Sequence, residues 1–267
     1  MPLYHRHFVG VRYTYRSFLN HHPTTDGSKL ISKDRFNTMD VWARFYPHKR
    51  VQIFAVIPIN SNSETESGST IRTVGLGDIQ VWANYALVQT PDSAKSPWRH
   101  TLLAGGGIKT ASGMNNAKNR VGERMGQSLQ PGTGSWDALV NAVYTVRYKQ
   151  WGLNTDVTAR ITTSNRQGFR FGNHISGSTK FFYWAKYRKW SFLPQAGVLA
   201  DYGMKDRNAG VKVDDSGGFA FLGTLGADVY YKRYVVGVTL QQPMYSNLGG
   251  GSVTPYQRYS ANFAVMF

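Results

Sequence analysis

Apolar and polar residues alternate one by one through most of this chain, in segments separated by turn residues. In the segment 9–16, for example, every odd position is apolar or aromatic and the even positions are mostly polar. A repeat of two residues is typical of a β-strand with one apolar face. About twelve segments follow this pattern: His7 to Phe18, Phe36 to Tyr46, Val51 to Ile59, Asp78 to Val88, His100 to Lys109, Ala138 to Lys149, Leu153 to Ile161, Lys180 to Tyr187, Phe192 to Asp201, Phe219 to Tyr231, Tyr234 to Gln242 and Gln257 to Phe267. The pattern predicts an all-β fold.

The connections between these segments are alternately short and long. The short ones lie at 46–50, 91–97, 149–150, 188–189 and 232–233, and the long ones at 19–34, 60–74, 110–136, 162–178, 202–217 and 245–256. Short periplasmic turns and long extracellular loops are typical of outer-membrane barrels. Aromatic residues flank several short turns, as expected of a girdle at the head-group level. We therefore predict one transmembrane antiparallel up-and-down β-barrel over 1–267; aromatic caps on the hairpins of a soluble sheet are the alternative.

The last predicted strand, 257–267, sets Tyr259, Phe263 and Phe267 on one face and Arg258 and Asn262 on the other. A terminal strand that alternates in this way and ends on Phe resembles the closing strand of bacterial outer-membrane barrels. This resemblance implies a location in the bacterial outer membrane. From the strand count and the alternation, we also predict that this strand pairs with 7–18 to close the barrel, with Arg258 directed inward.

Composition narrows the class of membrane protein. The chain of 267 residues is 41% hydrophobic, with a mean hydropathy of −0.38, and it has no run of about 18 apolar residues, which excludes helical spans. A barrel tolerates this polarity because only alternate residues meet lipid. Cysteine is absent, which excludes a disulfide, a thiolate metal site and a cysteine nucleophile. The first residues show no apolar export signal, although the predicted location requires one.

The formal net charge of +16, from 31 Lys and Arg against 15 Asp and Glu, would suggest a nucleic acid as partner of a soluble chain. Here the basic residues are spread over strand interiors, turns and loops. Their distribution instead favours a barrel with a basic lumen and basic turns. The expected partners are outer-membrane lipids, small solutes and other envelope proteins, with no nucleic acid.

Three glycine-rich segments mark the boundaries between strands and loops: Gly75 to Asp78, Gly107 to Gly113 and Pro131 to Asp137. In this order they resemble the outer-membrane barrel family named for the MetA pathway of phenol degradation, although Ala111 stands where we expect a proline. The resemblance implies a barrel and the passage of small molecules, aromatic ones among them, and the family name is no evidence of an enzymatic step. From the residues themselves, Asp78 and Asp137 are expected to anchor loops at the extracellular rim, with ligand binding as the alternative.

Charged residues on the polar faces belong in the lumen, because they are costly in lipid. The candidate solute-contacting residues are Arg12, Arg16, Asp40, Trp42, Arg44, Trp82, Asn141, Arg147, Asp156, Arg160, Trp184 and Arg258. The arginines would attract anions, and the tryptophans offer apolar surfaces to an aromatic solute. Alternatively, Arg and Asp side chains pair with one another and fill the lumen, so that the barrel is plugged.

The longest loop, 110–136, is expected to be functional because of its length. If it folds into the lumen, it narrows the channel and presents Lys109, Lys118, Arg120 and Arg124 to solutes. This predicts an anion-favouring constriction.

We therefore predict a passive outer-membrane channel or transporter for small solutes, anionic or aromatic, without cofactor or metal. A docking subunit of a larger envelope complex is the alternative. An outer-membrane lipase or protease fits the sequence less well, because such an enzyme needs a base beside a nucleophile. His174 and Ser176 are two residues apart but fall in a predicted loop, and the adjacent His21 and His22 have no further metal ligands nearby.

Overall fold

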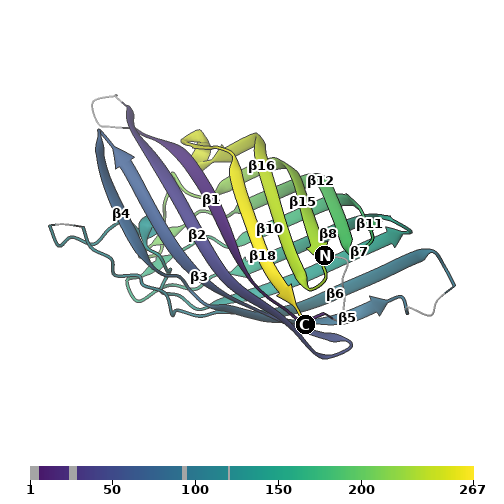
Figure 1. Ribbon diagram of the computed structural model, residues 1–267. Coiled ribbons are helices and arrows are strands. Elements are labelled where there is room, and N and C mark those ends of the chain that lie inside the picture. Colours follow the sequence, from purple (N-terminus) through teal and green to yellow (C-terminus); the bar gives the residue numbers. More distant parts are fainter. Residues whose placement is uncertain (1–5, 24–28, 92–94, 120) are drawn as a thin grey trace.

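The computed structural model describes residues 6–23, 29–91, 95–119 and 121–267. Strands joined in sequence order form a closed antiparallel barrel of 12 strands, which confirms the predicted fold (Figure 1). The barrel strands are β1 (Phe8–Pro23), β2 (Lys29–His48), β3 (Val51–Glu66), β4 (Ser69–Leu76) continued by β5 (Gln80–Gln89), β6 (Trp98–Lys109), β7 (Asp137–Tyr148), β8 (Trp151–Ile161), β10 (His174–Tyr183) continued by β11 (Ala185–Tyr187), β12 (Trp190–Gly203), β15 (Gly218–Tyr231), β16 (Tyr234–Leu248), and β17 (Val253–Pro255) continued by β18 (Arg258–Met266).

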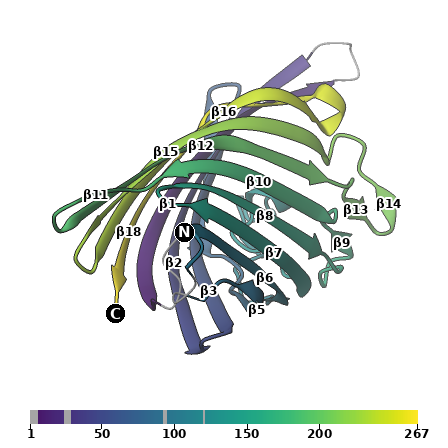
Figure 2. The same ribbon diagram turned by 90° about the vertical axis from the view of Figure 1, so that its right-hand side faces the viewer.

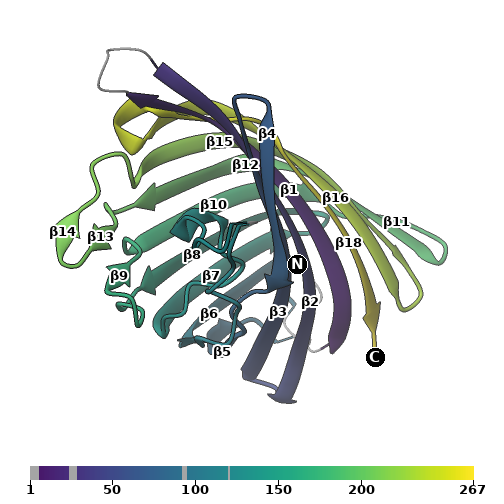
Figure 3. The same cartoon turned by 90° about the vertical axis from the view of Figure 1, so that its left-hand side faces the viewer.

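Small elements lie in the connections between the barrel strands. They are β9 (Phe169–Arg170), β13 (Arg207–Asn208) and β14 (Val211–Lys212), which form a separate three-stranded sheet, and the 3-10 turns η1 (Gln127–Leu129) and η2 (Gly249–Gly251). Among the described residues, no helix has the length and apolar character needed to cross a membrane. Figures 2 and 3 show β9, β13 and β14 at one end of the barrel, and β11 with the C-terminus at the other.

The first and last barrel strands close the structure. Antiparallel pairs run from Phe8 opposite Met266 to Tyr15 opposite Tyr259, and β18 also pairs with β16. Arg258 points into the barrel, where Nη1 lies 2.9 Å from Oδ2 of Asp201. The predicted closure and the inward direction of Arg258 are confirmed.

The apolar positions form an outward band. Val9, Val11 and Tyr13, which alternate along β1, are between 42% and 46% exposed. A large exposed apolar surface is explained when lipid replaces water around the protein. At the short turns the predicted aromatic residues pack in pairs, as Trp190 does with Tyr231 at a centroid distance of 4.4 Å. These rings complete the girdle at that end of the barrel.

Two predicted long loops are in fact strands. Most of 19–34 belongs to the hairpin of β1 and β2, and most of 60–74 belongs to the hairpin of β3 and β4. Beyond the lipid both faces of a hairpin meet water, so the alternation of apolar and polar residues stops although the hydrogen-bonded ladder continues. The segment 61–66 is polar at every position, so the alternation that predicts a strand is missing there.

Candidate functional site: a charged cavity above an aromatic cluster

A cavity of about 1070 Å³ occupies the interior of the barrel. It reaches from the middle of the strands, at Arg12 and Asp40, to the ends that bear the long loops, at Gly217 and Gly249. Its lining combines five Lys or Arg side chains with five carboxylates: Arg12, Arg16, Arg160, Lys180, Arg258, Asp40, Asp201, Asp206, Asp215 and Asp228. Apolar side chains such as Leu199 and Leu248 also line it. The cavity can therefore hold a polar solute of moderate size.

Two ion pairs lie in the wall of this cavity. Arg12 Nη2 lies 2.6 Å from Oδ2 of Asp40 on the neighbouring strand β2, and Arg258 pairs with Asp201 from a strand that is not its neighbour. Both pairs confirm that arginine and aspartate partly neutralise each other in the lumen. They do not fill it, because the cavity remains between them.

Arg16 and Arg160 have no such partner. Within the described parts of the chain, no carboxylate lies within salt-bridge distance of either. Arg16 lies among the charges of Arg258, Asp201, Asp40 and Arg160. The guanidinium group of Arg16 also lies 5.9 Å from the ring centroid of Phe36. Arg16 and Arg160 therefore bring two positive charges to the cavity that no direct ion pair within the described chain offsets.

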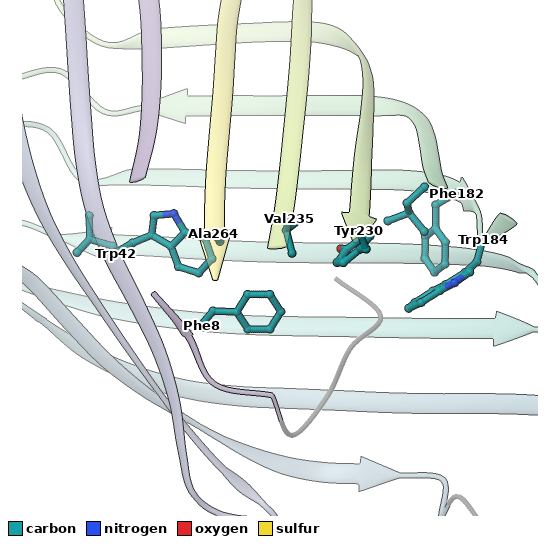
Figure 4. Packing of buried hydrophobic residues seen from close by; sticks show 9 residues of the cluster. Phe8, Trp42, Phe182, Trp184, Tyr230, Val235 and Ala264 are labelled. Carbon is teal, nitrogen blue, oxygen red and sulfur yellow. The ribbon is translucent and has the colours of Figure 1, made fainter. Parts of the chain in front are cut away.

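An apolar cluster fills the lumen at the short-turn end. Figure 4 shows Phe8, Trp42, Phe182, Trp184 and Tyr230 inside the barrel. Phe8 is completely buried, and Trp184 is 6% exposed. The rings of Trp42 and Phe54 stack at 5.5 Å, and those of Phe54 and Trp82 at 4.7 Å, which forms a ladder across three strands.

This aromatic cluster separates two cavities. Phe182 and Leu193 line the large cavity, whereas Trp184 and Tyr230 line a smaller one of about 350 Å³ at the short-turn end. The lining of the smaller cavity contains five basic side chains and no carboxylate: Arg6, Lys186, Lys189, Lys232 and Arg233. A solute that crosses the barrel along its axis must pass the cluster and then meets positive charge.

Of the twelve predicted lumen residues, five line the large cavity: Arg12, Arg16, Asp40, Arg160 and Arg258. The others make contacts inside the wall or the aromatic cluster. Arg44 lies over the ring of Phe8 at 4.2 Å, and Arg147 over that of Trp184 at 5.7 Å.

The remaining predicted residues are also used by the barrel itself. Asn141 donates a hydrogen bond to Thr158 Oγ1 at 2.8 Å, and Asp156 accepts one from Ser178 at 2.6 Å. Trp42, Trp82 and Trp184 do face inward, but they belong to the aromatic cluster.

The loop 110–136 lies on the inward face of β3 and β4 but outside the large cavity. Asn60 donates a hydrogen bond to the carbonyl of Pro131 at 2.6 Å, and Thr73 donates one to that of Leu129 at 2.6 Å. The loop thus packs on β3 and β4, and no described residue of it lines the large cavity. Arg124 donates to the carbonyl of Asn115, and Lys118 forms a β-bridge with Arg124. Arg120 lies outside the described residues.

Lys109 does not present its charge to solutes. It is 2% exposed, and its Nζ lies 2.8 Å from Oδ2 of Asp78 and 3.1 Å from Oδ2 of Asp137. Asp78 also accepts hydrogen bonds from the backbone of Gly113 and Thr133. The three glycine-rich segments therefore meet in one buried ionic cluster, which anchors the loop as the sequence predicted.

Sequence reasoning missed His174 as a lumen residue. It is the first residue of β10 and pairs across the ladder with Arg160. The alternation of His174, Ser176, Ser178 and Lys180 on one face was the available signal, but Gly177 and Thr179 interrupt the apolar positions of the other face and hid it. No hydrogen bond joins His174 to Ser176 in the described chain.

The comparisons with solved structures agree with this geometry. The chain is similar to the COG4313 outer membrane channel from Pseudomonas putida F1, with a TM-score of 0.71 and 14% sequence identity over 100% of this chain and 97% of that one. The fold is that of an outer-membrane barrel. It is also similar to the β domain of the Bordetella autotransporter BrkA, with a TM-score of 0.53 and 7% identity over 97% of this chain and 100% of that chain. No family model and no curated protein matches the chain, so its resemblance to the MetA-pathway family stays a prediction.

Proposed function

We propose that this protein is a passive channel of the bacterial outer membrane for small solutes that carry negative charge and an apolar or aromatic part. The observation that carries the proposal is the large cavity, which lies inside a closed barrel and is lined by both charged and apolar side chains. A barrel that served only as a membrane anchor would have no need to keep such a cavity. The likeness in fold to an outer-membrane channel supports the same function.

Charge supports the preference for anions. Arg16 and Arg160 lack ion-pair partners among the described residues, and the smaller cavity at the short-turn end is lined by basic side chains without a carboxylate. A solute that leaves the large cavity therefore meets positive charge on both sides of the aromatic cluster. Rings in such pathways restrict the passage of water and ions by keeping the constriction apolar.

Swelling of liposomes tests the proposal. Proteoliposomes that contain the full chain should swell faster in isotonic benzoate than in isotonic benzylammonium, a cation of similar size, while empty liposomes respond to neither. Equal rates for the two ions would contradict the anion preference. The absence of swelling with either ion and with small neutral solutes would contradict the channel itself and would favour the docking subunit.

A further inference from the structure

We propose that Arg16, Arg160 and Arg258 together form a binding site for a small organic dianion with two carboxylate groups. The site lies in the middle of the large cavity, and the inference rests on the proposed function because it names the solute class of the same cavity. Its parts come from three strands, β1, β8 and β18.

Like charges are placed side by side at the seam of the barrel. Tyr15 pairs with Tyr259 between β1 and β18, so the next inward positions, Arg16 and Arg258, are cross-strand neighbours. Directly opposed like charges destabilise a sheet. Arg160, from the far side of the sheet order, adds a third guanidinium group to the charges around Arg16. The alternation of polar and apolar residues requires only a polar side chain at these inward positions. The sequence nevertheless places arginine there, although neighbouring like charges are unfavourable.

Nearby carboxylates neutralise this charge only in part. Asp201 pairs with Arg258, and Asp40 pairs with Arg12. Asp206 accepts a hydrogen bond from the backbone of Gly172 at 2.7 Å and forms no salt bridge with a described residue. Asp206 lies within electrostatic reach of Arg160, so Asp201 and Asp206 offset two of the three guanidinium charges, and the site keeps one positive charge in excess.

Hydrogen-bonding capacity is also left over. The Nε atoms of Arg16, Arg160 and Arg258 are buried, and none has a hydrogen-bond partner among the described residues. Polar groups inside proteins are ordinarily satisfied, and each exception calls for an explanation such as a bound ion or water. All three side chains line one cavity, where a bound anion can accept the hydrogen bonds that their Nε atoms do not make within the described protein.

Two carboxylates fit the arrangement better than one compact ion. A guanidinium group matches the planar geometry of a carboxylate. Arg16 and Arg258 form one cationic position at the seam, while Arg160 forms a second beside its cross-strand partner His174. Leu199 and Leu248 line the same cavity and can contact the apolar spacer between two carboxylates.

Isothermal titration calorimetry on the full chain, folded in detergent at 0.15 M salt, tests the site. We expect saturable binding of phthalate, at least tenfold weaker binding of benzoate and of inorganic phosphate, and no binding of benzylamine. R16Q and R160Q should each weaken phthalate binding about tenfold or more, the loss expected for one charge-assisted hydrogen bond. R16K and R160K, which keep the charge but not the planar fork, should fall between the wild type and the glutamine variants.

R72Q is the matched control, because Arg72 lies exposed on β4 and bonds to Ser61 outside the cavity. It should bind phthalate as the wild type does, and heat-modifiable migration in gels should show that every variant is folded. The proposal is overturned if phthalate does not saturate, if phosphate binds equally well, or if folded R16Q and R160Q bind like the wild type. Phthalate binding without liposome swelling would contradict the channel function but support the dianion site. Liposome swelling without phthalate binding would support the channel function but contradict the site.

Discussion

At the scale of single residues, Lys109 is the side chain whose burial depends most on specific partners. A buried ammonium group is stable only when it is paired and fully hydrogen-bonded. Here Asp78 and Asp137 neutralise it, and the carbonyl of Ser135 accepts a further hydrogen bond at 2.8 Å. The sequence predicted that the aspartates anchor a loop, but not that Lys109 joins them. Its partners come from segments up to 31 residues away, so only the folded loop reveals that the lysine points into the wall.

Asp78 gives this cluster a predictable response to acid. Burial acts to raise the pKa of Asp78, but hydrogen bonds from Lys109 and Thr133 outweigh it and hold the pKa below 3.8. A carboxyl group with a lowered pKa stabilises the fold above its unfolded pKa, and this contribution is lost as the pH falls through the folded value. We therefore expect the loop 110–136 to lose amide protection, measured by hydrogen exchange and corrected for intrinsic rates, only below about pH 3.8.

Asp78→Asn should remove the same protection at neutral pH. It breaks one of two buried ion pairs of Lys109, at a cost to loop docking of roughly 3 kcal/mol. Asp214→Asn is the control, because Asp214 pairs with Lys205 on the surface, away from this loop. Wild-type protection of the loop in Asp78→Asn would contradict the anchoring role.

At the scale of elements, β6 depends on glycine. A Cβ atom on Gly105 would lie 1.9 Å from the carbonyl oxygen of Ala83, and one on Gly107 would lie 2.1 Å from that of Val81. Both contacts are with the backbone of β5, which cannot move without breaking the ladder. The glycine run in the sequence indicated a close approach of another backbone, although not which strand approaches.

Gly107→Ala should lower the folded fraction of the barrel, because overpacking against a rigid backbone costs roughly 1–3 kcal/mol. Gly177→Ala is the matched control: it also lies within a barrel strand, and its Cβ would meet Val157 at an ordinary 3.7 Å. The measurement is heat-modifiable migration after refolding in a urea series. Equal midpoints for the two variants would refute the steric explanation.

The strands themselves were predictable wherever lipid imposes a period of two. The strands were harder to predict from the sequence where they extend beyond the lipid, in the hairpins of β1 to β4 and at the start of β10. There both faces of a strand meet water or the polar lumen, and the sequence carries little contrast between them.

At the scale of the whole molecule, the aromatic cluster is the main obstacle along the barrel axis. The sequence predicted that Trp42, Trp82 and Trp184 face inward, but not that they pack together. Cross-lumen contacts such as that of Arg258 with Asp201, 57 residues apart, depend on barrel diameter and tilt, which alternation does not specify.

Trp184→Ala should raise single-channel conductance in planar bilayers several-fold, since it removes a large ring from the constriction. It should also destabilise the barrel by roughly 3–5 kcal/mol, the usual cost of truncating a buried Trp. Trp136→Ala, at an exposed ring near the loops, is the control. If both variants conduct like the wild type, the cluster is not the barrier.

The seam between β1 and β18 also determines when the molecule can be completed. Phe8 pairs with Met266, so the contact that closes the barrel joins residues at opposite ends of the described chain. Contacts between distant residues form slowly, because the entropy of closing the intervening segment must be overcome first. β1 cannot receive its second neighbour until β18 has reached the membrane, and until then its edge can pair with other chains. Assembly must therefore protect β1 through the whole interval between the arrival of the first strand and that of the last.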